Sequence, residues 1–122
     1  MSPRNELRQW EVVLVEFPFV DLVGRKLRPA LIVSNDELNG VSNAVIALQI
    51  TSNLRSGFAE YNVLITDRDV ARYSGTRPIK PSIVKPYVVF TLDKKLVRKR
   101  LGVLKEEKVA EVKEGLRRAF GL

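Results

Sequence analysis

The chain contains no cysteine and no histidine among its 122 residues. The lack of cysteine excludes disulfides and thiolate metal sites. The lack of histidine removes the usual zinc and iron ligand, and also the side chain that most often transfers protons near neutral pH. A catalytic triad that contains histidine is excluded for the same reason, so any catalysis must rely on other side chains.

Several larger sequence patterns are missing as well. No apolar run approaches the roughly 20 residues that a membrane-spanning helix needs. The first ten residues, MSPRNELRQW, lack the apolar core of an export signal, so we expect a cytoplasmic protein. There is also no P-loop, no G-x-G-x-x-G motif and no nucleophile elbow, and we predict neither a cofactor nor a metal.

Positive charge is what the chain has in excess. Its 21 basic residues outnumber 14 acidic ones, which gives a net charge of +7 and a pI near 10.0. This balance favours polyanionic partners, nucleic acid before an anionic membrane surface, because no basic amphipathic helix supports membrane binding. The alternative is a lysine-rich surface that serves only solubility.

The length and the apolar pattern predict a single, mainly β domain of the α+β class over residues 1–122, with residues 1–8 as a flexible arm. Short β-rich runs separated by turn residues predict the strands. These runs cover residues 11–17, a segment starting at Arg28, and residues 44–51, 59–66 and 82–93. The last run is either one strand or two strands broken at Pro86.

Three helical segments are expected between and after these strands. Asparagine and aspartate residues predict a short helical turn within residues 34–40, and Asp67 is expected to cap a brief helix over residues 68–73. The strongest prediction is a helix over residues 105–120 that ends at Gly121. Its apolar stripe consists of Val109, Val112, Leu116 and Phe120.

One pair of residues at two strand ends points to a phosphate site. If the strands starting at Arg28 and ending at Thr51 pair antiparallel about the middle of their connection, paired residue numbers add to 79. Arg28 and Thr51 then face each other, and a cation beside a hydroxyl suits a phosphate. Two alternatives remain: a surface ion pair for Arg28 with Thr51 merely ending a strand, or a bulge that turns one side chain away.

Other side chains give weaker signals. Asp67 and Asp69 at a helix start are more typical of caps than of a metal site. Glu16 and Asp21 have the chemistry of an acid–base pair, but their spacing across Pro18 fixes no geometry. Trp10 is interpreted as a hydrophobic anchor rather than as a base-stacking residue.

The order of several motifs resembles the MazF/PemK family of toxin endoribonucleases. The motifs are VVLVEFPF, RPALIVS, ITS, KPSIVKP, TLD and RLGVL ahead of the last helix, and the resemblance extends from about residue 10 to the end. It implies a small SH3-like barrel of antiparallel strands, as in the CcdB and PemK toxins, with short helices and a C-terminal helix. The family's catalytic arginine and threonine fall on Arg28 and Thr51.

The resemblance also implies an activity and its partners. The implied reaction is metal-independent cleavage of single-stranded RNA by its own 2′-OH, leaving a 2′,3′-cyclic phosphate. The implied partners are a second copy of the chain in a homodimer and a cognate antitoxin with an acidic, partly disordered tail. The residues that we expect to bind RNA are Phe19, Arg25, Lys26, Ser52, Arg55, Arg77 and Lys80.

The sequence departs from the family pattern at two positions. Trp10 stands where the family usually has glycine before the first strand, and Lys105 stands where serine or aspartate commonly caps the last helix. Two rival functions also remain open. One is a gyrase poison of the CcdB kind, although the chain ends in Phe-Gly-Leu instead of Trp-Gly-Ile. The other is a non-catalytic SH3-like nucleic-acid-binding module.

Overall fold

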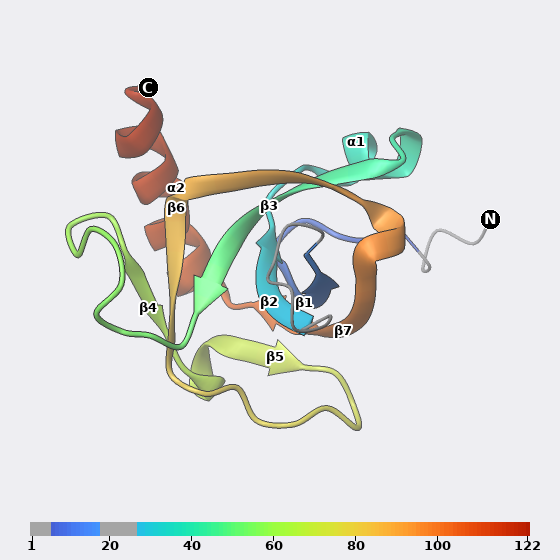
Figure 1. The fold of residues 1–122 in the computed structure, drawn as a ribbon, viewed down its shortest axis with the longest axis horizontal. Coiled ribbons are helices and arrows are strands. Elements are labelled where there is room, and N and C mark those ends of the chain that lie inside the picture. Colours follow the sequence, from blue (N-terminus) through green and yellow to red (C-terminus); the bar gives the residue numbers. More distant parts are fainter. Residues whose placement is uncertain (1–5, 18–26) are drawn as a thin grey trace.

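The computed structural model describes residues 6–17 and 27–122, and within them seven strands form one antiparallel sheet that curves into a nearly closed barrel (Figure 1). The strands follow the order β4-β6-β3-β2-β1-β7-β5. This architecture, with a C-terminal helix beside the barrel, confirms the predicted fold class. The strands are β1 (Glu11–Glu16), β2 (Leu27–Ile32), β3 (Ala44–Thr51), β4 (Val63–Ile65), β5 (Val70–Arg72), β6 (Ser82–Asp93) and β7 (Val97–Leu104).

The helical elements are short except for the last. They are α1 (Asp36–Val41), α2 (Glu106–Phe120) and the 3₁₀ turns η2 (Asp67–Asp69) and η3 (Lys94–Leu96). The predicted turn within residues 34–40 is confirmed by α1, where the side chain of Asn35 accepts the N–H of Leu38 as an N-cap. No helix in the described residues is long and apolar enough to cross a membrane.

The connection between β4 and β5 corrects two predictions. Residues 68–73 do not form a helix, because Val70–Arg72 pair with β7 instead, and the cap of the short turn is Thr66 rather than Asp67. The predicted strand over residues 59–66 shrinks to Val63–Ile65, since the N–H groups of Tyr61 and Asn62 both donate to the carbonyl of Phe58 in a turn. The two edge strands are thus joined by one tight turn, which brings the sheet edges together.

Strand β6 resolves the alternative at Pro86. It is one continuous strand, but its pairing with β3 changes register after Leu48–Val89, so that the next pair is Gln49–Lys85. Residues 86–88 have no partner in β3 and form an irregularity at which β6 bends. Gly115 of α2 packs against this point, where an added Cβ would lie 2.6 Å from Pro86 Cγ.

The sheet has two apolar faces. One face carries Val12, Leu31 and Leu48 and packs on Val112 of α2, and all four residues are fully buried. The other face lies among β1, β2, β3 and the second half of β6, with Val13, Ile32 and Leu92 at its centre. These alternating residues explain why nearly continuous apolar runs form β1 and β3.

Helix α2 begins one residue later than predicted, at Glu106, and Lys105 makes no side-chain cap, as the departure from the family pattern suggested. Val112 is buried, and Val109 and Leu116 pack on the same core. Phe120 does not complete the stripe, because it is 60% exposed on the last turn of the helix. Gly121 ends the helix with φ of 71°, as predicted.

Trp10, which stands where the resemblance implies a glycine, does not shift the start of the first strand. Its φ is 71°, a left-handed conformation that glycine adopts more easily than any other residue. The backbone is held there because the Trp10 N–H donates to Ile32 and its carbonyl accepts from Leu104, at 2.7 and 2.9 Å. The indole packs against the core and Lys113 lies over its ring, which confirms Trp10 as a hydrophobic anchor.

Candidate functional site

The pairing of β2 with β3 follows the predicted register. The pairs are Ala30–Gln49, Leu31–Leu48 and Ile32–Ala47, and the residue numbers of each pair add to 79. The same register, continued by two residues, places Arg28 opposite Thr51 on one face of the sheet. The described pairs of β2 and β3 contain no bulge, so the alternative that a bulge separates the two side chains is not supported.

Arg28 and Thr51 line one groove with a volume of about 690 Å³, called here the Arg28 groove. Arg28 is exposed at the start of β2, and Thr51 is half-buried at the end of β3. No carboxylate in the described residues pairs with Arg28, so the alternative of a surface ion pair finds no support there. The guanidinium therefore keeps its hydrogen-bond donors for a ligand.

The hydroxyl of Thr51 is already oriented from one side. Its Oγ1 accepts the backbone N–H of Asn53 at 3.1 Å. A hydroxyl has one donor and two acceptor positions, so this bond fixes one acceptor position and leaves the proton able to point to a ligand. Ser52, the next residue in the chain, lines the same groove.

The loop between β5 and β6 forms one wall of the groove and contributes Arg77 and Lys80 to its lining. This wall is anchored, because the N–H of Ile79 donates to Asp67 Oδ1 at 2.9 Å and the Ile79 side chain packs on the core. Asp67, interpreted from sequence as a helix cap, thus holds the wall instead. Two cations from this loop therefore line the same groove as Arg28.

Four of the remaining predicted residues are not placed in the groove. Arg55 lies in the loop after β3 and is exposed, but it does not line the groove. Phe19, Arg25 and Lys26 lie outside the described residues, as does Asp21. Glu16 pairs with Arg98 at 2.9 Å and does not line the groove either.

Sequence reasoning missed several residues that line the groove. They are Phe17, Gln49, Ser82, Phe90 and Lys99, besides apolar side chains. Phe17 and Phe90 meet edge to face, with ring centroids 5.0 Å apart. Gln49 carried a signal that could have been used, since it is a polar residue within an apolar strand. Lys99 carried no such signal, because it lies in a charged run without the apolar pattern that predicts a strand.

The lining of the Arg28 groove is electrostatically one-sided. Its charged members in the described part of the chain are Arg28, Arg77, Lys80 and Lys99, with no aspartate or glutamate. None of these four side chains has an ion-pair partner in the described residues. A concave site with unpaired cations concentrates positive potential and attracts a polyanion.

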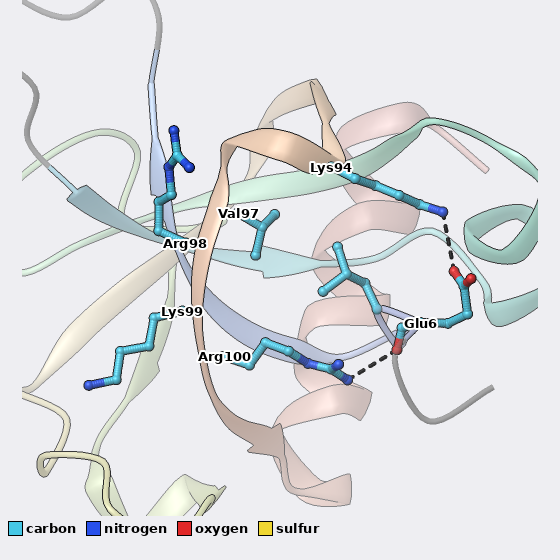
Figure 2. A pocket seen from close by; sticks show the side chains of 7 residues that line it. Glu6, Lys94, Val97, Arg98, Lys99 and Arg100 are labelled. Atoms are coloured by element: carbon cyan, nitrogen blue, oxygen red, sulfur yellow. Dashed lines mark hydrogen bonds and ion pairs between the residues drawn. The ribbon is translucent and has the colours of Figure 1, made fainter. Parts of the chain in front are cut away.

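A second cavity, of about 530 Å³, lies between β7 and residues 6–7 and is called here the β7 cavity (Figure 2). Its basic side chains are Lys94, Arg98, Lys99 and Arg100. Three of them pair with carboxylates, namely Lys94 with Glu6, Arg98 with Glu16 and Arg100 with Glu11, at 3.2, 2.9 and 2.5 Å. Figure 2 shows Lys94 and Arg100 reaching toward Glu6, whereas Lys99 points away from it.

Glu11 is the buried centre of the pairing at β7. It is fully buried and accepts from the Tyr73 hydroxyl, the Arg100 Nε and the Arg8 N–H, at 2.7, 2.5 and 2.8 Å. Burial raises the pKa of Tyr73, and the hydrogen bond to Glu11 raises it further. Burial lowers the pKa of Arg100, but Glu11 outweighs burial, so that pKa lies above its ordinary value. The polar groups of this network are therefore paired with one another inside the protein.

The sequence profile of the PemK-like, MazF-like toxins of type II toxin–antitoxin systems matches residues 8–120. The match extends over nearly the whole chain and includes both strands that carry Arg28 and Thr51. The chain therefore belongs to this family.

Solved structures show the same fold. A MazE–MazF structure from Deinococcus radiodurans has a TM-score of 0.73 at 23% identity, covering 95% of this chain and 97% of that one. An endoribonuclease from a Mycobacterial species has a TM-score of 0.69 at 23% identity, covering 97% and 94%. The Mycobacterium tuberculosis toxin MazF-mt6 has a TM-score of 0.70 at 20% identity, covering 92% and 97%.

Proposed function

We propose that this protein is the toxin of a toxin–antitoxin pair and an endoribonuclease that cleaves single-stranded RNA without a metal ion. The observation that carries this proposal is the Arg28 groove, in which Arg28 and Thr51 lie beside unpaired cations and no described carboxylate. Family membership supports the toxin role, and relatives of the same fold are named endoribonucleases. The groove offers no carboxylate, imidazole or thiolate from the described residues to hold a divalent cation.

The proposed reaction is an internal transfer at phosphorus. The substrate's 2′-oxygen bonds to the phosphorus and loses its proton, while the bond to the 5′-oxygen breaks and that oxygen gains a proton. The products are a 2′,3′-cyclic phosphate and a 5′-hydroxyl. Arg28 donates two parallel hydrogen bonds to the phosphate oxygens as negative charge builds. An arginine side chain stays protonated in proteins and is therefore a poor base, so we assign Arg28 to charge stabilisation.

Thr51 and the wall residues are proposed to place the RNA. The Thr51 hydroxyl, held by Asn53, donates to a phosphate oxygen or contacts the 2′-OH, and Ser52 adds a neighbouring contact. Arg77 and Lys80 follow the RNA backbone along the wall that the loop between β5 and β6 forms. Phe19, Arg25, Lys26 and Arg55 stay proposed RNA contacts on sequence grounds.

The proposed partners follow from the family and from charge. We propose a cytoplasmic homodimer that is neutralised by an antitoxin with an acidic, partly disordered tail. Relatives of the same fold have been solved with antitoxins, one as a MazE–MazF structure and one as an endoribonuclease with its cognate antitoxin. The net charge of +7 suits an acidic tail as well as RNA.

The decisive experiment incubates the purified protein with a defined RNA in EDTA and maps both ends of every fragment. We expect specific cuts with cyclic phosphate ends, reduced at least about 10²–10³-fold in rate by Arg28→Ala, because the guanidinium that stabilises the developing charge is lost. Thr51→Ala is expected to lower the rate as well. Both variants should unfold at the wild-type midpoint, since Arg28 is exposed and Thr51 ends a strand.

The same experiment separates the rival functions. Intact RNA across varied sequences, together with RNA binding, would move the assignment to a non-catalytic nucleic-acid module. Inhibition of gyrase without RNA cleavage would favour the CcdB-like function. Cleavage that EDTA abolishes would contradict the metal-independent mechanism.

A further inference from the structure

The loop that follows Thr51, residues 52–62, is fastened to strand β6 by two polar side chains. Lys85 and Tyr87 flank Pro86 on β6, at the point where the pairing of β6 with β3 changes register. Lys85 donates through Nζ to Ser56 Oγ. The Tyr87 hydroxyl accepts from the Phe58 N–H at 2.7 Å and donates to Asn62 Oδ1 at 2.8 Å. The two side chains therefore hold the loop at its middle and at its end.

Lys85 is buried, which is unusual for a lysine. Only 8% of Lys85 is exposed, and no carboxylate in the described residues pairs with it. Burying an unpaired cation costs free energy, so packing alone does not explain a lysine here. Lys85 also lies directly across from Gln49, which lines the Arg28 groove.

The close fit of the loop on these two side chains is visible at Gly57. Its φ is 73°, and an added Cβ would lie 1.9 Å from the Tyr87 hydroxyl oxygen and 3.0 Å from Lys85 Cε. Glycine is therefore required by backbone conformation and by space at once. The loop backbone rests directly on the two anchors, without room for a side chain between them.

A continuous run of hydrogen bonds leads from Tyr87 to the candidate catalytic hydroxyl. Asn62, held by Tyr87, donates through Nδ2 to the carbonyl of Ser56 at 2.9 Å. The N–H of Ser56 donates to the carbonyl of Asn53 at 3.1 Å. The N–H of Asn53 then donates to Thr51 Oγ1, also at 3.1 Å. Displacement of the loop at Tyr87 therefore reaches Thr51 through four hydrogen bonds, the first of them from the Tyr87 hydroxyl to Asn62.

We propose that Lys85 and Tyr87 are positioning residues, which orient the Thr51 hydroxyl toward the scissile phosphate by holding loop 52–62 against strand β6. Neither side chain lines the groove, so both act through the loop. This inference rests on the proposed function, because it is through Thr51 that the loop acts on RNA. A displacement of about 1 Å at a reacting group lowers the reaction rate by up to about 10²-fold. Holding the loop in place is therefore expected to affect the rate.

The test compares Tyr87→Phe with the matched control Tyr61→Phe. The first removes the hydroxyl that holds Phe58 and Asn62 and keeps the ring. The second removes a hydroxyl that bonds to no described residue, from a ring whose centroid lies 6.0 Å from that of Tyr87. We expect Tyr87→Phe to lower kcat about tenfold with KM changed less than about twofold, and Tyr61→Phe to leave both unchanged.

A double-mutant cycle distinguishes positioning from general loosening. If Tyr87 acts through Thr51, then Tyr87→Phe has no further effect on kcat in the Thr51→Ala background. An equal loss in both backgrounds would overturn the proposal. Lys85→Met should show the same dependence on Thr51, since it removes the bond to Ser56 while keeping an apolar stem of similar length.

A second measurement without RNA keeps this inference separate from the proposed function. The side-chain rotamer of Thr51, from NMR scalar couplings to its methyl group, is expected to be single in the wild type and averaged in Tyr87→Phe. An unchanged rotamer would overturn the positioning role, whether or not the protein cleaves RNA. A wild type that cleaves no RNA but shows the rotamer change would overturn the proposed function alone.

Discussion

The Arg28 groove and the β7 cavity have similar charge but opposite pairing. Each is lined by four basic side chains from the described residues, with Lys99 shared between them. In the β7 cavity three of the four pair with Glu6, Glu11 and Glu16. In the Arg28 groove none has a carboxylate partner in the described residues. The number of cations thus does not distinguish the two sites, whereas the absence of carboxylate partners among the described residues does.

The difference predicts that mutations in the two regions affect different properties. Cations that pair with glutamates inside the protein stabilise the fold, because each cation offsets the cost of burying the negative charge. Cations without partners add little to stability and stay available to RNA phosphates. Changes near β7 should therefore alter unfolding, and changes in the Arg28 groove should alter activity and binding.

The largest effect on stability is expected from Glu11→Ala. Removing this fully buried carboxylate leaves Arg100 and Tyr73 without their shared acceptor. Breaking a buried pair in this way costs about 3–5 kcal/mol, so the urea midpoint should fall steeply. Glu114→Ala, which breaks an exposed pair with Arg117, is the control and should cost less than about 0.5 kcal/mol. Equal effects of the two would show that the β7 network is not structural.

A smaller effect is expected from Tyr73→Phe, and it should depend on pH. Loss of the hydrogen bond to Glu11 should cost about 1.5 kcal/mol of unfolding free energy at pH 7. The pKa of Tyr73 is raised above its ordinary 10.0 in the folded protein. Its stabilisation is therefore complete below pH 10 and is lost as the pH rises through the folded-state value. Urea unfolding from pH 7 to 11 should show the wild type and the variant converging, and a constant gap would contradict this.

The fold could be predicted where local pattern and tertiary context agree. Strand β3 and the register of β2 with β3 follow from two apolar runs and the turn residues between them. Strand β7 could not be found in this way, because its first half is a charged run whose side chains pair with glutamates distant in sequence. Residues 70–72 likewise become a strand only because β7 lies beside them.

Part of the candidate site could be predicted from the sequence, because its two central residues meet through local strand pairing. Arg28 and Thr51 meet through one hairpin, so local register arithmetic is enough to bring them together. Lys99 enters the groove from β7 and Phe90 from β6, and such contacts depend on strand order in the barrel. The left-handed φ of Trp10 also needs tertiary bonds to Ile32 and Leu104, which no local pattern reveals.

The most direct test of the central claim removes one cation from each region and measures RNA binding. The ligand is a single-stranded RNA blocked by 2′-O-methyl groups, and the variants are Lys80→Ala in the Arg28 groove and Arg98→Ala in the β7 cavity. We predict that Lys80→Ala weakens binding and flattens the dependence of log K on log salt by about 0.7, as for one lost phosphate contact. Arg98→Ala should leave affinity and slope unchanged. A flattened slope in Arg98→Ala with an unchanged slope in Lys80→Ala would contradict the assignment of the Arg28 groove as the RNA site.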